Sequence, residues 1–211
     1  MIFALFLAFA ANLILRLNDF VPGFRGFPLA ELMIPVLLLL WLLFEKKDFS
    51  LATDILVPLF FIIIVVGYVV VVWPAGAFEI AKPLIPWVVL YFLTTNLAHS
   101  SRRIDVMAAL LIATSLVLVL HSTQQYFNYD GVDDLSGVGW SGETTLQGRA
   151  RYVGVMNDPN DLALFFSMML PLTLQLAGKK MPQRKQWLGY VLCIPLLWGI
   201  FLCNSRGGML A

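Results

Sequence analysis

Residues 55–73 are ILVPLFFIIIVVGYVVVVW, an apolar stretch of 19 residues without a charged side chain. A helix of about 20 apolar residues spans the hydrocarbon core of a bilayer. The rest of the chain has the same character, because mean hydropathy is +0.83, 60% of residues are hydrophobic and only 13% are charged. A soluble domain of 211 residues cannot bury that much apolar surface. We therefore predict an all-α, polytopic transmembrane helix bundle.

About seven such helices are expected, in a single transmembrane domain that covers residues 1–211. The chain closes on an apolar stretch with no polar tail, so we expect it to be the N-terminal part of a longer protein. The net charge of +1 gives no reason to expect a nucleic-acid partner. The predicted membrane segments are Ile2–Leu15, Leu29–Phe44, Ile55–Trp73, Leu84–Leu97, Val106–Phe127, Leu162–Ala177 and Trp187–Cys203.

Orientation follows from the basic residues of the connections, which are more frequent on the cytoplasmic side of a membrane protein. The connections 45–54, 98–105 and 178–186 hold Lys46, Lys47, Arg102, Arg103, Lys179, Lys180, Arg184 and Lys185. The connections 16–28, 74–83 and 128–161 hold Arg16, Arg25, Lys82, Arg149 and Arg151. We therefore predict a cytoplasmic N-terminus, with loop 128–161 and the end of the seventh helix on the opposite, non-cytoplasmic side.

Loop 128–161 ends in the polar sequence RARYVGVMNDPND, residues 149–161. Part of it has a structural explanation, because Asp158 suits the N-cap of a helix, Pro159 its first position and Asp161 its first turn. Two arginines and two asparagines in the same segment favour a second interpretation. They indicate a polar pocket at the helix N-terminus that holds a phosphate group. The four residues are Arg149, Arg151, Asn157 and Asn160.

A second polar motif, NSRGG at residues 204–208, follows the seventh predicted helix on the same side of the membrane. Arg206 has two interpretations: an interfacial side chain at a helix end, or a cation that binds a ligand beside Gly207 and Gly208, which allow close backbone approach. A third polar stretch, at residues 121–127, carries His121 and either Gln124 or Gln125 on one helical face. For this stretch we favour a helix that emerges into water and headgroups over a sugar-binding cavity.

No zinc pattern occurs, and the acidic residues of 128–148 lack the ligand spacing of a calcium loop, so we expect no metal and no cofactor. A protein with arginines at helix ends and prolines within helices also fits a secondary transporter of an anionic solute. The transporter is therefore the alternative function.

The order of the two arginine motifs resembles the bacterial O-antigen ligase and polymerase superfamily. The resemblance rests on Arg151-Tyr-Val-Gly154, then Asn157-Asp-Pro-Asn160, and then Asn204-Ser-Arg206-Gly-Gly208 after the next helix. It covers residues 104–211, and the earlier helices share only a general character with the family. These are inner-membrane enzymes that transfer a glycan from undecaprenyl diphosphate to a lipid-core, polysaccharide or protein acceptor on the periplasmic face.

The resemblance implies a GT-C-like helical architecture and an inverting glycosyl transfer that needs no metal. It makes Arg151 and Arg206 candidate ligands of the lipid diphosphate, with Asn157 and Asn160 shaping the pocket. Arg149 lies outside the Arg-x-x-Gly pattern and is a weaker candidate. The family's catalytic histidine lies in a large later outer loop, which we expect beyond Ala211. The chain alone is then expected to be inactive.

Overall fold

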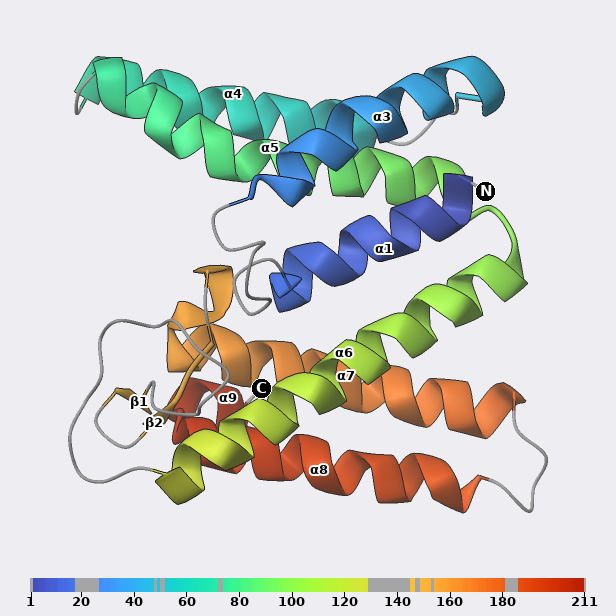
Figure 1. Cartoon of the computed structure of the whole chain (residues 1–211), viewed down its shortest axis with the longest axis vertical. Helices are drawn as coiled ribbons and strands as arrows, with labels where there is room; N and C mark the ends of the chain where they lie inside the picture. The colour runs from blue at the N-terminus through green and yellow to red at the C-terminus, as the bar shows by residue number, and fades with distance from the viewer. Residues whose placement is uncertain are drawn as a thin grey trace. The chain divides into compact units, whose positions relative to one another are not determined.

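The computed structural model describes residues 2–17, 27–47, 49, 52–71, 74–128, 145–146, 149–152, 154–180 and 186–210. These residues are almost entirely helical (Figure 1). The helices are α1 (Ile2–Leu15), α3 (Leu29–Phe44), α4 (Thr53–Val71), α5 (Pro74–Leu97), α6 (Ser101–Asn128), α7 (Pro159–Lys180), α8 (Trp187–Cys203) and α9 (Arg206–Leu210). Two short strands, β1 (Thr145–Leu146) and β2 (Arg149–Ala150), and the 3-10 helix η1 (Gly154–Asn157) precede α7.

The helical prediction is confirmed, and three predicted segments coincide with α1, α3 and α8 at both ends. The largest difference concerns α5, which begins at Pro74 and not at Leu84. We expected a connection at 74–83 because Glu79 and Lys82 interrupt the apolar pattern. Both are nevertheless helix-compatible residues, so the helix continues through them. Trp73, the predicted end of the third segment, lies outside the described residues.

Three of the described helices are long and apolar enough to cross a membrane, judged by length and composition. The candidate spans are Thr53–Val70 with mean hydropathy 2.5, Gly76–Leu97 with 1.4 and Ser101–Asn128 with 2.2. Helices α1, α3 and α8 are apolar but shorter. A membrane-embedded bundle and a GT-C-like architecture stay predictions.

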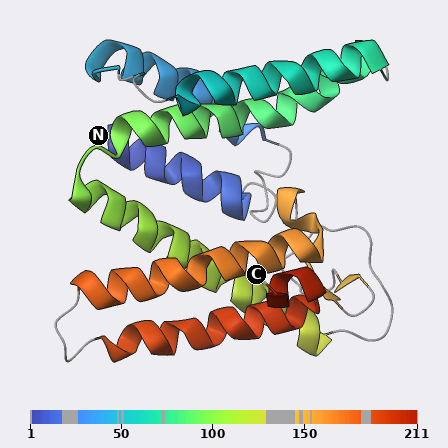
Figure 2. The same cartoon turned by 180° about the vertical axis from the view of Figure 1, so that it is seen from behind.

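The chain divides into two compact units. The first unit comprises residues 1–13 and 28–104, and in it α4 and α5 lie side by side while α3 packs against α5 (Figure 2). Tyr91 of α5 donates a hydrogen bond to Thr53 Oγ1 at 2.6 Å and contacts Asp54 Oδ1 at 3.1 Å, which joins α5 to the start of α4. The prediction of one domain over 1–211 stays a prediction.

The second unit comprises residues 14–27 and 105–211 and contains both arginine motifs. Helices α7 and α8 run side by side (Figure 1) and meet α6 at Gly199. A Cβ at Gly199 would lie 2.8 Å from both Phe166 Cε2 and Val119 Cγ2, so only glycine leaves room for the three helices at this point. Buried apolar side chains from α6, α7 and α8 form a continuous core here, and this core supports the segments that carry the arginines.

Candidate functional site

The N-terminus of α7 has the capping arrangement that the sequence predicts. Pro159 is the first helical residue, and the backbone N–H of Asn160 donates to Asp158 Oδ1 at 2.7 Å. Asp158 and Asp161 are both exposed at this helix end. The helix therefore uses its own carboxylate as a cap, and two negative charges surround the remaining N–H groups. Any diphosphate at this site must be bound mainly by arginine side chains and not by the helix N-terminus.

The side chain of Asn160 joins the two arginine motifs. Its Oδ1 atom accepts hydrogen bonds from Arg149 Nη2 at 3.0 Å and from Ser205 Oγ at 2.8 Å. We call Arg149, Asn160 and Ser205 the Asn160 cluster. It connects β2 and the start of α7 to the turn between α8 and α9, which lies 45 residues after Asn160 in the sequence. The second unit thus brings the two predicted motifs together.

Arg149 also closes the end of α8. Its Nε atom donates to the carbonyl oxygen of Cys203 at 3.0 Å. The last carbonyls of a helix lack partners within the helix and carry partial negative charge, so a guanidinium group suits this position. Asn204 follows with a left-handed backbone (φ 45°), which asparagine adopts more readily than most residues. Arg149 is therefore engaged within the protein by two of its nitrogen atoms.

Arg206 directly follows Ser205 of the Asn160 cluster, but its environment differs from that of Arg149. It is the first residue of α9 and is exposed. In the part of the chain that the structure describes, no hydrogen bond or ion pair engages its guanidinium group. Arg206 is therefore the site arginine that an external anion reaches most directly.

Gly208 serves helix packing, which differs from the expected close approach of backbone to a ligand. A Cβ at this position would overlap the Cβ of Ala163 in α7. Ser167 Oγ donates to the carbonyl oxygen of Gly208 at 2.9 Å, and the Gly208 N–H donates to Ser205 Oγ at 3.1 Å. Glycine lets α9 lie directly on α7, and this packing holds Arg206 next to the Asn160 cluster. Both Gly207 and Gly208 are part of α9.

The segment that contains Arg151 is buried and held by α6. Arg151 is only 4% exposed, and its backbone N–H donates to Gln125 Oε1 at 2.9 Å. Tyr152 packs edge-on against His121, with ring centroids 5.0 Å apart, and its hydroxyl donates to the carbonyl of Leu15 at 2.6 Å. A ligand must enter the protein to contact the Arg151 guanidinium, whereas Arg206 is open to solvent.

The end of α6 corrects the interpretation that we favoured from the sequence. His121 and Gln125 are buried, 1% and 0% exposed, and do not emerge into water. Packing against Tyr152 and the hydrogen bond to Arg151 account for this difference. Tyr126, the next residue, is 47% exposed. The spacing of His121 and Gln125 on one helical face was the sequence signal that the two side chains share an environment. Their buried partners come from distant parts of the chain, so the sequence alone did not indicate burial.

The remaining predicted residue, Asn157, lies at the end of η1 and is exposed. Its side chain makes no hydrogen bond within the described residues, unlike that of Asn160. Ser205 and Gln125, which were not among the predicted site residues, are the ones that hold the motifs in place. No group of three or more histidine, cysteine, aspartate or glutamate residues with the geometry of a metal site occurs within the described parts of the chain.

Comparison with known proteins gives no family assignment. No family model, no curated protein and no solved structure matches the chain.

Proposed function

We propose that this chain is a polytopic membrane protein that binds an undecaprenyl diphosphate-linked glycan for transfer to an acceptor. In this proposal it acts in the bacterial inner membrane, with the site on the periplasmic face, as in O-antigen ligase-like glycosyltransferases with a GT-C-like architecture. One observation carries the proposal. Two arginine motifs converge at Asn160 in the second unit, and Arg206 is exposed beside them.

In this proposal the site residues have different roles. Arg206 contacts the diphosphate, because its guanidinium is exposed and its planar fork matches two phosphate oxygens. The Asn160 cluster fixes the α8–α9 turn from which Arg206 projects. Asn157 lies at the exposed rim, and Arg151 supports the site from within. Membrane lipid surrounds the helices, and the lipid tail of the donor lies among them.

Glycosyl transfer breaks the bond between the anomeric carbon and an oxygen of the diphosphate. Negative charge then grows on the undecaprenyl diphosphate leaving group. A fixed arginine stabilises that charge, and removal of one preorganised donor from such a site typically costs about 3–4 kcal/mol. The histidines of this chain are His99 and His121. Neither belongs to the Asn160 cluster, so the proposal assigns donor binding, and no catalytic base, to these residues.

The alternative, a secondary transporter of an anionic solute, predicts interrupted helices with their ends near the bilayer midplane. Helices α4, α5, α7 and α8 instead continue through Pro58, Pro86, Pro171 and Pro195. Both arginine motifs also occur at helix ends. These observations favour the lipid-diphosphate site over the transporter.

The test is glycan transfer from an undecaprenyl diphosphate donor in membranes that contain the full-length protein. We expect Arg206→Ala to lower the rate by about 100-fold to 1,000-fold at unchanged protein abundance. Arg206→Lys should recover only part of the activity, because lysine lacks the planar fork. Arg102→Ala, which removes another exposed arginine outside the site, is the matched control.

Equal transfer by Arg206→Ala and the parent protein would overturn the assignment of Arg206. If the parent protein itself neither binds the donor nor supports transfer, the glycosyltransferase proposal fails.

A further inference from the structure

Helix α5 carries two opposite charges that have no part in the site described above. Glu79 and Lys82 both lie within the candidate span Gly76–Leu97, and both are exposed. Lys82 is three residues after Glu79 and four after Phe78, which is 75% exposed, so the three side chains share one side of the helix. In the described parts of the chain, no hydrogen bond or ion pair engages either charged group. Charged side chains inside a membrane span are rare and normally face a polar partner.

The register between α4 and α5 gives the depth of these charges. The two helices are antiparallel neighbours (Figure 1), and the Tyr91 hydroxyl of α5 donates to Asp54 Oδ1 of α4 at 3.1 Å. Both helices rise by about 1.5 Å per residue, so residues equally far from this contact are level with one another. Lys82, nine positions before Tyr91, is therefore level with Ile63, nine positions after Asp54. Glu79 lies almost one turn further along.

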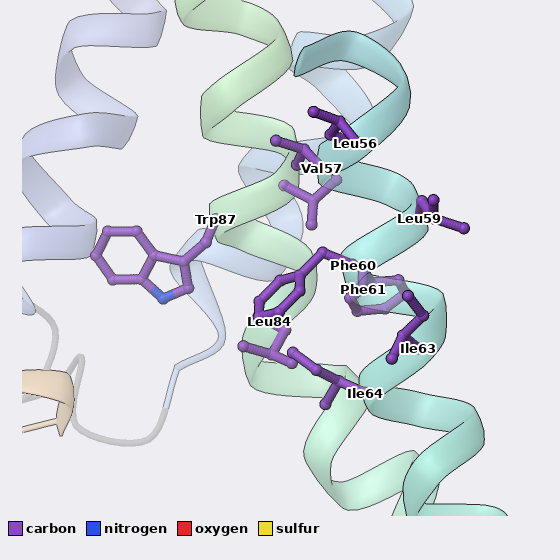
Figure 3. A pocket seen from close by; sticks show the side chains of 10 residues that line it. Leu56, Val57, Leu59, Phe60, Phe61, Ile63, Ile64, Leu84 and Trp87 are labelled. Carbon is purple, nitrogen blue, oxygen red and sulfur yellow. The ribbon is translucent and has the colours of Figure 1, made fainter. Parts of the chain in front are cut away.

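The groove between the two helices has the same register. Phe61 of α4 and Leu84 of α5 line this groove together (Figure 3). Leu84 is seven positions before Tyr91, and Phe61 is seven positions after Asp54. The hydrogen bond at one end of the helix pair and the apolar contacts nearer its middle therefore agree.

The two charges are thus level with the centre of the most apolar helix. Ile62 is the central residue of α4, Thr53–Val71, whose span has a mean hydropathy of 2.5. When α4 crosses a bilayer, Glu79 and Lys82 lie within about 6 Å of the midplane, four residues or fewer along the helix axis. The headgroups begin about 15 Å from the midplane, which is too far for either side chain to reach. A partner within the membrane is therefore required.

The arrangement of the charges selects this partner. A face that carries both signs three residues apart is complementary to a second copy of itself. An ion pair within one helix would leave both groups facing lipid, with most of the ammonium donors unmatched. Two copies related by a two-fold axis along the membrane normal place their α5 helices at one depth. Glu79 then differs in height from the partner subunit's Lys82 by about 4.5 Å, which two extended side chains can span.

We propose that the protein forms a dimer through this face of α5, with Glu79 of each copy paired with Lys82 of the other. Phe78 and Ile85, which is 44% exposed, flank the charges and complete the interface. The inference rests on the membrane insertion that is part of the proposed function, but not on glycosyl transfer. One symmetry operation forms both ion pairs and removes all four charges from lipid. The requirement for opposite charges at one depth also gives the dimer a single register.

The test measures Förster resonance energy transfer between donor-labelled and acceptor-labelled copies of the full-length protein in liposomes at low protein density. Glu79→Lys makes the face doubly positive, and Lys82→Glu makes it doubly negative. Each variant should associate with itself about tenfold more weakly than the parent protein, because like charges then meet. A mixture of the two variants should recover the association, because a positive face then meets a negative one. Pairing within one helix predicts no such recovery.

Two further variants make the result specific. The Glu79→Leu, Lys82→Leu double variant makes the span more apolar, so it inserts at least as readily as the parent protein. It should be monomeric at a density at which the parent protein is dimeric. Lys46→Glu reverses an exposed charge outside the candidate spans and should leave the association unchanged. Parent-like association of the leucine double variant would overturn the proposal, as would a mixture of charge-reversed variants that associates no better than each variant alone.

The two proposals fail in different ways. A protein that alkaline carbonate extracts from membranes is not inserted, and both proposals then fail. An inserted protein whose copies do not associate contradicts only the dimer. Association through α5 without glycan transfer contradicts only the glycosyltransferase proposal.

Discussion

The two units hold their helices together in different ways. In the second unit, side chains from distant segments share hydrogen bonds at Asn160, at Gln125 and between Ser167 and Gly208. In the first unit, only 6% of the α4 span is buried. Polar contacts between distant segments specify one arrangement, whereas exposed apolar faces suit contact with lipid.

Glycine substitutions should reveal the largest difference between the units. Gly199→Leu in α8 forces a side chain against Phe166 and Val119, and we expect a loss of about 3 kcal/mol in unfolding free energy. Gly67→Leu in α4 is the control, because no atom outside the adjacent residues and the neighbouring backbone of its own helix lies within 4 Å of its Cβ position. It should be neutral or stabilise the helix by about 0.5 kcal/mol. Denaturant titration in detergent micelles measures the unfolding free energy of both variants. Equal losses of unfolding free energy would show that α4 is tightly packed.

The two predicted pocket asparagines provide the next test, within the second unit. Asn160→Ala removes the common acceptor of Arg149 and Ser205, and we expect a loss of about 2 kcal/mol. Asn157→Ala changes an exposed side chain without a described hydrogen bond, so its effect should stay within about 0.5 kcal/mol. Thermal unfolding of both variants in the same detergent gives the comparison. If the two variants unfold alike, the Asn160 cluster does not hold the motifs together.

The smallest effect is expected for the polar contact of the first unit. Tyr91→Phe removes the hydroxyl that contacts Thr53 and Asp54, which should cost about 1 kcal/mol. Tyr190→Phe in α8 is the matched control, because that tyrosine is 69% exposed and makes no hydrogen bond among the described residues. The unfolding midpoints of both variants, followed by intrinsic fluorescence, measure this difference. A loss of unfolding free energy in Tyr91→Phe well above that in Asn160→Ala would reverse the proposed contrast between the units.

Much of the helical structure could be predicted from local sequence. The ends of α1, α3 and α8 coincide with the ends of apolar segments, because polar or helix-breaking residues flank them. The start of α7 was also predictable, since Asp158 and Pro159 have strong positional preferences at a helix N-terminus. The start of α5 was not, because charged residues can continue a helix as readily as they can end one.

The sequence by itself determined that the chain is helical and that two arginine motifs follow one another around α7 and α8. Both are local properties, set by apolar segments, caps and residue type. Only the tertiary structure decided the roles of the motif residues. It engages Arg149 with Asn160 and Cys203, buries Arg151 beside Gln125, and leaves Arg206 exposed. The reason is that burial and hydrogen-bond partners depend on residues 11 to 54 positions apart in sequence, which no local pattern specifies.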